Sequence, residues 1–288
     1  MMDIEIKVPA TVANLGPGFD CLGAAVGMYL RLRVTLSESA AVTGVGRTRP
    51  PDENLTHRAI RTAFEEAGSE APPITVEQVE VYPSARGLGA SASAIVAGLV
   101  AARETADLGL SDADLARIAI RIEGHADNVL PAFFGGLVLS SPHGWMRFEP
   151  TEEVSPLILL AAQKFQTEKA RAVLPAELPR EDAVANASAS AALVAVLTGV
   201  ESPEALFWAT EDRVHEPYRL PLMSDTFEVH QAMRAQGIPT ALAGAGPSLI
   251  CLVSSERIVE AEAAARKTVP DGWEVMTPGW DREGAKVR

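Results

Sequence analysis

The stretch SARGLGASASAIVAG, residues 84–98, surrounds small and hydroxyl residues with glycines and then becomes steadily apolar. Consecutive backbone N–H groups in a glycine turn form a positively polarised concave surface, and a helix beginning at Ala90 or Ser91 adds its dipole. The spacing matches neither the dinucleotide fingerprint nor the P-loop, which needs a lysine that is absent here. From this segment alone, a strand-to-helix turn with Ser91 or Ser93 as N-cap is the simpler explanation, and a phosphate loop is the alternative.

Two further glycine-rich segments change this balance. VPATVANLGPGFDCLG, residues 8–23, is a polar interruption directly after a first strand, and AGAGPS, residues 243–248, connects two apolar strands. Turn formation alone does not require three such loops in a chain of 288 residues. The three together therefore favour a phosphate-binding site.

In this order the segments resemble the motifs of the GHMP small-molecule kinases. RGLGASAS is similar to that family's phosphate loop, P-x-x-x-G-L-G-S-S-A, beginning here at Pro83. AGAGPS resembles its C-terminal glycine motif, and ATVANLGPGFD its N-terminal substrate motif. EGHADNVLPAFFGGLVL (123–139), QTEKARAVLP (166–175) and HEPYR (215–219) are similar to segments of the homoserine kinase branch. The six matches run from residue 8 to about residue 253, nearly the whole chain.

The resemblance implies an α+β protein with the GHMP kinase fold. A ribosomal-protein-S5-like α/β domain, residues 1–150, is expected to bind ATP and to pack on a ferredoxin-like α+β domain, residues 151–288. The periodicity of the sequence agrees, because strands and helices alternate irregularly and a proline-bearing stretch, Pro142 to Pro156, separates two halves. Helices are expected near 55–68, 92–106, 186–198, 203–213, 224–236 and 256–268, and a further helix begins with a capping box at Ser111 and Asp114.

At the nucleotide end, the resemblance implies ATP and Mg²⁺ as cofactors. Ala90 replaces the first serine of the family loop, whereas Ser91 is retained and is expected to meet the metal together with Glu123. Asn54 matches a position that contacts adenine, although an Asn before a helix is also an ordinary N-cap. The expected cofactor-binding residues are Asn54, Arg86, Gly87, Leu88, Gly89, Ala90, Ser91, Ala92 and Ser93.

At the substrate end, the resemblance implies L-homoserine, which carries a carboxylate, an ammonium group and the hydroxyl to be phosphorylated. Arg171 and Arg219 fall at the family's carboxylate-binding positions, and a planar guanidinium suits a carboxylate. Asp20 and Asp127 are candidates for the ammonium group and for aligning the hydroxyl. The expected substrate-binding residues are Asn14, Asp20, His125, Arg171 and Arg219.

Each of these residues also has an ordinary structural explanation. A typical arginine of this chain is a surface residue beside a carboxylate, GFD is compatible with a turn capped by aspartate, and His125 with a satisfied loop histidine. The expected catalytic residues are Asp127, Asn128 and Thr167, the last adding a hydroxyl near the transferred phosphoryl group. Asn128 stands where some relatives have a base aspartate, so transfer without a dedicated base is plausible.

The implied activity is ATP:L-homoserine O-phosphotransfer, a step of threonine synthesis. The nearest alternative is a related kinase of mevalonate, pantoate or shikimate, but these lack the ammonium group that two aspartates would serve. A non-catalytic nucleotide-binding regulator is a second alternative, and it predicts loss of residues such as Ser91, Glu123, Arg171 and Arg219, which are all present.

Composition limits the partners. The formal net charge of −13 argues against nucleic acid and anionic membranes, and no apolar run reaches the length of a membrane span. The two cysteines form no disulfide framework, and the start of the chain lacks the apolar region of a signal peptide. We therefore expect a cytoplasmic protein, and the family resemblance implies a homodimer.

Overall fold

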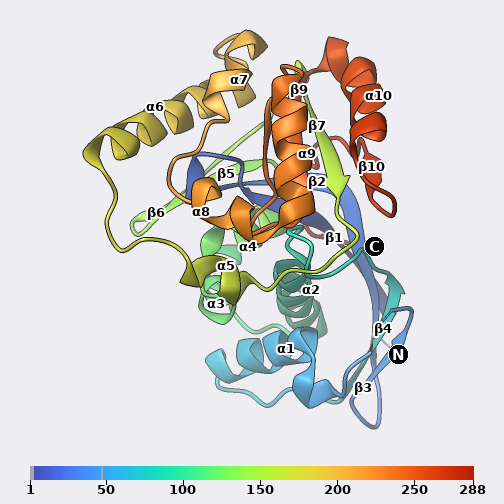
Figure 1. Ribbon diagram of the computed structural model, residues 1–288. Coiled ribbons are helices and arrows are strands. Elements are labelled where there is room, and N and C mark those ends of the chain that lie inside the picture. Colours follow the sequence, from blue (N-terminus) through green and yellow to red (C-terminus); the bar gives the residue numbers. More distant parts are fainter. Residues whose placement is uncertain (1–2, 47) are drawn as a thin grey trace.

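Two sheets organise the computed structural model, which describes residues 3–46 and 48–288 (Figure 1). The first has the order β11-β1-β2-β4-β3, with β5 and β6 added beside the other half of β2. Only β3 and β4 pair in parallel among the strands described. The strands of the first sheet are β1 (Asp3–Asn14), β2 (Gly18–Leu36), β3 (Ala41–Gly44), β4 (Ile74–Glu80), β5 (Leu137–Ser141), β6 (Gly144–Phe148) and β11 (Lys286–Val287).

A long hairpin of β1 and β2 forms the spine of this sheet. Its register runs from Asp3 opposite Thr35 to Asn14 opposite Gly18, with two irregular steps. The expected polar interruption over residues 8–23 is wrong, because β1 continues to Asn14 and all its residues from Val8 onward are buried. Both faces of this stretch are covered by protein, so its sequence lacks the alternation that marks a half-exposed strand.

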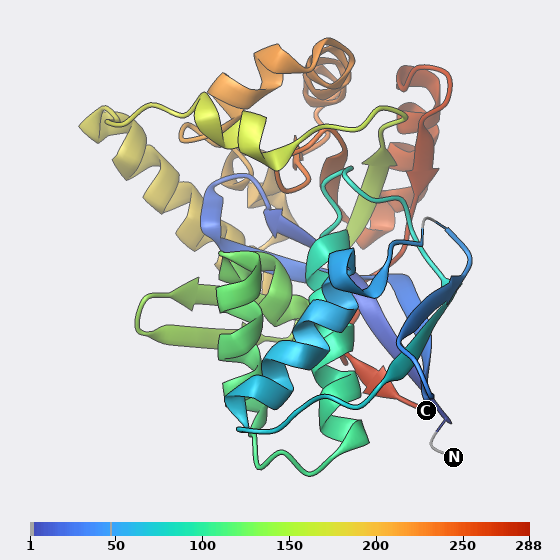
Figure 2. The same cartoon turned by 90° about the horizontal axis from the view of Figure 1, so that it is seen from below.

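Four helices form a layer beside the first sheet: α1 (Leu55–Glu66), α2 (Ala90–Thr105), α3 (Asp112–Glu123) and α4 (Ala126–Phe134) (Figure 2). The α2 and α4 helices pack on its strands, and α1 and α3 pack on α2. The α2 helix is central to this layer, and it touches β1 as well as the other three helices. Gly98 allows α1 to come close, since a Cβ there would lie 2.3 Å from the Thr56 carbonyl oxygen. The capping box of Ser111 and Asp114 at the start of α3 is confirmed.

The second sheet has the order β10-β7-β9-β8 and carries the remaining helices. Its strands are β7 (Val154–Leu160), β8 (Thr240–Leu242), β9 (Leu249–Ser254) and β10 (Glu274–Met276). Its α-helices are α5 (Thr167–Ala172), α6 (Arg180–Leu197), α7 (Leu206–Ala209), α8 (Glu216–Arg219), α9 (Ser224–Ala235) and α10 (Ile258–Thr268). The 3₁₀ turns of the chain are Pro51–Glu53, Pro203–Ala205, Leu220–Leu222 and Ser255–Arg257. The helix expected over 203–213 is shorter, since α7 ends at Ala209 and an irregular loop follows.

An apolar cluster joins the two sheets. Val12 and Leu22 of the hairpin, Ile158 of β7, Ile250 of β9 and Leu193 of α6 all belong to it and are fully buried. The α+β prediction is confirmed by the two mixed layers. None of the described helices is both long and apolar enough to cross a lipid bilayer.

The end of the chain returns to the first sheet. Trp280 bridges Val26 of β2 and donates its indole N–H to the Val154 carbonyl at 2.7 Å. The β11 strand then pairs with β1. The domain boundary near residue 150 stays a prediction. Wherever that boundary lies, the last residues of the chain pack on the first sheet.

Candidate active site

The glycine loop before α2 is built by close contacts that only glycine permits. Gly89 adopts φ 64°, ψ 29°, and a Cβ on it would lie 2.0 Å from the Thr11 hydroxyl oxygen and 2.8 Å from Oδ1 of Asn128. Gly87 faces the other glycine loop, where a Cβ would lie 2.0 Å from the Ala243 carbonyl oxygen. Two glycine segments distant in sequence therefore meet at the N-terminus of α2.

That helix N-terminus is suited to an anion. Gly89, and not a serine, is the N-cap, so no side chain accepts from the first N–H groups of α2. In addition, Nε of Arg86 is buried and has no hydrogen-bond partner among the residues described. Orphaned donors and a helix dipole at one place fit the phosphates of a nucleotide.

Ser93 does not take part in this arrangement. Its hydroxyl is fully buried, 2.6 Å from the Tyr82 hydroxyl, and donates to the Pro9 carbonyl at 2.8 Å. Asn54 is the N-cap of α1, and its Oδ1 accepts from the backbone N–H groups of Thr56 and His57. The ordinary capping role of Asn54 is therefore present, and its contact with adenine stays a prediction.

A line of polar side chains leads from α2 toward the start of α4. The Ser91 hydroxyl donates to the Glu123 carboxylate. His125 follows, with Nε2 3.9 Å from Glu123 and Nδ1 2.6 Å from Oδ1 of Asp127. The hydrogen bond to Asp127 raises the pKa of His125 despite partial burial. This line joins the expected metal residues to the expected substrate residues.

The Ser91–Glu123 contact also bears on the expected metal. No group of three or more His, Cys, Asp or Glu side chains is arranged for a metal ion within residues 3–46 and 48–288. Mg²⁺ bound to nucleotides, however, keeps several waters and takes phosphate oxygens as ligands, so one hydroxyl and one carboxylate suffice from the protein. The pair fits such a site.

The turn between β1 and β2 brings Asp20 beside the second glycine loop. Asn14, with φ 70°, donates from Nδ2 to the Gly244 carbonyl at 2.8 Å, and its Oδ1 accepts from the Asp20 N–H at 3.0 Å. Close by, the Thr11 hydroxyl donates to Oδ1 of Asn128 at 2.8 Å. Both asparagines therefore fix the site through amide hydrogen bonds.

The two arginines approach this turn from different elements. Arg171 of α5 makes a bidentate ion pair with Asp20, with distances of 2.7 and 2.8 Å, and this hydrogen bonding raises its pKa. Arg219 of α8 is 2% exposed, and burial lowers its pKa. Both guanidinium groups lie near the Phe19 ring, whose centroid is 5.7 Å from Cζ of Arg171 and 5.0 Å from Cζ of Arg219.

The structure thus brings most of the expected site residues together. Thr167 is exposed at the start of α5, and no side-chain hydrogen bond of it occurs within the described chain. Sequence reasoning missed three contributors: Thr11, Phe19 and His215. All three lie inside the recognised motifs, ATVANLGPGFD and HEPYR. The sequence therefore marked their segments, but it did not show which contacts their side chains make.

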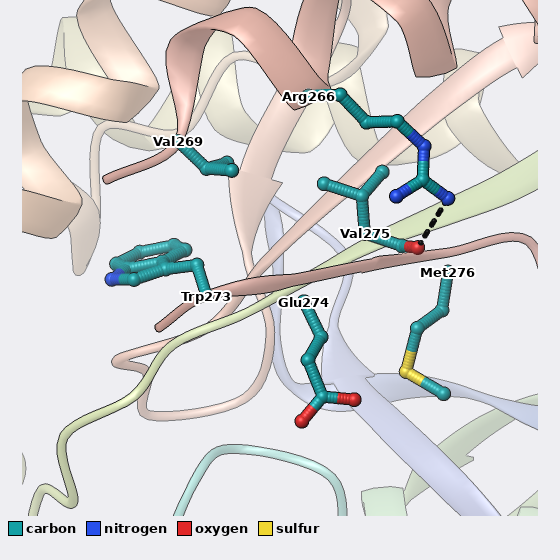
Figure 3. A pocket seen from close by; sticks show the side chains of 6 residues that line it. All are labelled: Arg266, Val269, Trp273, Glu274, Val275 and Met276. Atoms are coloured by element: carbon teal, nitrogen blue, oxygen red, sulfur yellow. Dashed lines mark hydrogen bonds between the residues drawn. The ribbon is translucent and has the colours of Figure 1, made fainter. Parts of the chain in front are cut away.

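A separate hollow of about 370 Å³ lies at the β10 edge of the second sheet and is not part of this site (Figure 3). The guanidinium of Arg266 there is already bonded to Glu262 and to the Val275 carbonyl. Its lining contains none of the expected site residues. The lining residues are Arg266, Val269, Trp273, Glu274, Val275 and Met276.

Comparison with known proteins agrees with this geometry. Residues 54–136 match the family described as GHMP kinases N terminal domain. A mevalonate kinase of 15% identity shares the fold, with a TM-score of 0.71 over 98% of this chain and 100% of that one. Fold and glycine loops therefore define the class of GHMP-type small-molecule kinases.

More similar proteins narrow the class. The homoserine kinase of Streptomyces avermitilis is 39% identical, over 99% of this chain and 95% of its own length. That of Leifsonia xyli is 41% identical, over 99% and 91%. The crystal structure of homoserine kinase from Cytophaga hutchinsonii has a TM-score of 0.87 at 27% identity, covering 99% of this chain and 97% of that one. This chain belongs to the homoserine kinase family, as its motifs indicated.

Proposed function

We propose that this protein transfers the γ-phosphoryl group of ATP to the side-chain hydroxyl of L-homoserine, giving O-phospho-L-homoserine for threonine synthesis. One observation carries the proposal. A carboxylate and two guanidinium groups, Asp20 with Arg171 and Arg219, gather around Phe19 beside the glycine loop. Charges of both signs at one end of the site suit an amino acid, which carries both charges itself.

Substrate binding would exchange partners within this cluster. The α-carboxylate of homoserine would accept from Arg171 and Arg219, and Asp20 would turn its oxygens to the ammonium group. The protein pair is partly exposed, at 47% for the Arg171 side chain and 36% for Asp20, so the exchange does not require opening of the core. An alcohol with only a carboxylate would leave Asp20 without a cation.

The nucleotide would occupy the glycine loop. Backbone N–H groups of the loop and the first turn of α2, with Arg86, would hold its phosphates, while Ser91 and Glu123 would hold Mg²⁺. A metal held by these two residues would help to neutralise charge on the transferred phosphoryl group. Ala90 contributes only its N–H, and the buried hydroxyl of Ser93 has no part in this proposal.

Proton removal from the substrate does not require a dedicated base in this proposal. Asn128 accepts from Thr11 through its amide oxygen and has no basic group. Asp127 is bonded to His125 and would align the hydroxyl for attack, with Thr167 near the phosphoryl group. In a loose transition state the attacking oxygen needs little negative charge. The main task of the protein is therefore to align the substrate hydroxyl with the phosphoryl group.

The test of this function is ATP consumption with a panel of alcohols: L-homoserine, mevalonate, pantoate, shikimate and homoserine methyl ester. We expect the highest kcat/KM with L-homoserine and a poor reaction with the methyl ester, which keeps the hydroxyl but lacks a free carboxylate. A higher kcat/KM with mevalonate, pantoate or shikimate would replace homoserine as the proposed substrate.

The metal site has a separate test. Glu123→Gln should raise the Mg²⁺ concentration for half-maximal rate, since an amide oxygen is a weaker ligand than a carboxylate. Glu66→Gln is the control, because Glu66 pairs with Arg121 on the surface. Equal Mg²⁺ dependence in both variants would assign the metal to another carboxylate.

We also propose a cytoplasmic homodimer, from the family resemblance. Light scattering would give twice the chain mass of 30.5 kDa for a dimer, and cell fractionation would locate the protein. A monomer mass at micromolar concentration, or recovery with membranes, would contradict these two proposals.

A further inference from the structure

Arg219 is a buried charge without an acidic partner. Its side chain is 2% exposed, and it forms no ion pair with any residue that the structure describes. A buried guanidinium needs hydrogen-bond acceptors in fixed places. Three neutral acceptors surround it: the Ala170 carbonyl at 3.1 Å from Nε, the Gly244 carbonyl at 3.5 Å from Nη1, and Nδ1 of His215 at 3.4 Å from Nη1.

The His215 ring differs from the two carbonyls, because its ability to accept depends on its protonation. The ring is fully buried, and Nε2 lies 2.9 Å from the Gly16 carbonyl oxygen. A carbonyl only accepts, so Nε2 carries the hydrogen and Nδ1 of the neutral ring presents a lone pair to Arg219. A second ring hydrogen would place two donors against each other.

Two carboxylates lie near this ring, and both are engaged by backbone N–H groups. Asp212 lies 3.7 Å from Nε2, but the same oxygen accepts from the backbone N–H groups of His215 and Glu216, each at 2.7 Å. Burial raises the pKa of Asp212. Glu216 points elsewhere, accepting from the Leu242 N–H at 2.6 Å.

We infer that His215, as the Nε2–H tautomer, is a positioning residue that aims the Arg219 guanidinium at the substrate carboxylate. It also ties Arg219 to the turn just before Asp20, because Gly16 belongs to that turn and the His215 ring stacks on Phe19, the neighbour of Asp20, at 5.2 Å between centroids. One imidazole thereby fixes the distance between the site's buried cation and its carboxylate. This inference rests on the proposed function, and it assigns His215 a part in the recognition of the substrate carboxylate.

Two conservative variants separate the two contacts of His215. In His215→Asn, the amide oxygen can occupy the place of Nδ1 and accept from Arg219, while the contact with Gly16 is lost. In His215→Gln, the amide N–H can occupy the place of Nε2 and donate to Gly16, while the acceptor for Arg219 is lost. Both variants remove the imidazole ring, so they share the loss of packing against Phe19.

We expect His215→Gln to raise the KM for homoserine about tenfold, the effect of one hydrogen bond to a charged group, with KM for ATP and kcat within about twofold. His215→Asn should keep the homoserine KM within about threefold of the parent at a similar loss of stability. His230→Asn is the control. That ring is also buried, beside Glu216, and makes no contact with Arg219, so it should lower stability without changing the homoserine KM.

Equal homoserine KM values for the Asn and Gln variants, or values that follow thermal stability across all three, would overturn the positioning role. The parent enzyme in the same assay tests the proposed function separately. Should the parent prefer another alcohol of the panel, the comparison is made with that alcohol, because mevalonate, pantoate and shikimate all carry the carboxylate that Arg219 would read.

Discussion

Arg171 and Arg219 approach the same phenylalanine ring but are held in opposite ways. Arg171 lies on the short helix α5, is nearly half exposed, and has its charge balanced by Asp20 through two hydrogen bonds. Arg219 lies on α8, is buried, and donates to two carbonyl groups and a neutral imidazole, with no carboxylate paired to it among the described residues. One charge is neutralised before substrate arrives, and the other is not.

This difference implies that the two arginines contribute differently to substrate affinity and to the stability of the protein. In the proposed binding mode, substrate would displace Asp20 from Arg171, and this exchange would cancel part of the gain from the new contact. Arg219 would offer the substrate carboxylate a charge that no carboxylate of the protein compensates. We expect this arrangement to cost stability, because burial without a carboxylate partner disfavours the charged guanidinium and lowers the pKa of Arg219.

The largest expected effect is that of Arg219→Met. Loss of a charge-assisted contact in a buried place should raise the homoserine KM about a hundredfold, with KM for ATP unchanged. At the same time the free energy of unfolding should stay equal or rise, because an apolar side chain of similar size replaces a desolvated charge. Steady-state kinetics and denaturant unfolding measure the two quantities.

The control for this variant is Arg234→Met. Unlike Arg219, Arg234 of α9 has a carboxylate partner, Glu211 at 3.7 Å, and it also donates to the carbonyl groups of Phe207 and Thr240. Its loss should therefore lower stability and leave the homoserine KM unchanged. If Arg219→Met lost as much stability as Arg234→Met, burial of the Arg219 charge would not be costly, and Arg219 would not differ from Arg171 in the way proposed.

Arg171→Met should have a smaller effect, about tenfold on the homoserine KM, because the parent must first break the Asp20 pair. Asp20→Asn should also raise KM, through the ammonium group. A double-mutant cycle with Asp20→Asn and Arg171→Met should give a total effect smaller than the sum of the single effects in free energy, since either change removes the competing pair. Strict additivity would mean that no exchange takes place.

Salt should affect the two arginines differently. Raising the ionic strength from about 0.05 to 0.5 M screens exposed charges more than buried ones. We expect the homoserine KM of the parent to rise about twofold to threefold, and this rise to vanish in Arg171→Met but persist in Arg219→Met. KM measured at matched ionic strengths, with sodium chloride and potassium acetate compared, checks this. A salt response that disappears only in Arg219→Met would reverse the assignment.

The smallest effect concerns the other carboxylate of the site, Asp127, whose partner His125 can lose its charge. The hydrogen bond to Asp127 raises the pKa of His125 above its ordinary value of 6.5. The stabilisation from this pair is therefore fully present below pH 6.5 and is lost as the pH rises through the folded-state pKa. His125→Asn should flatten the pH dependence of the unfolding free energy in that range. An unchanged slope would show that His125 stays in one protonation state.

The sequence by itself determined the family, the glycine loops and the α+β class, because these depend on residue types at short spacings. The capping box of α3 and the need for glycine at position 89 are likewise local properties of the backbone. The sequence also indicated which residues belong to the site. Their detailed roles stay predictions.

Tertiary structure decided how those residues are paired. Asp20 and Arg171 are 151 positions apart in the chain, so no local pattern shows that they neutralise each other. Burial of Arg219, the tautomer of His215 and the diversion of the Ser93 hydroxyl to Pro9 follow from which elements pack together. A residue's type fixes the charge and the hydrogen bonds it can make, but its neighbours in the folded chain decide which of them remain available to a ligand.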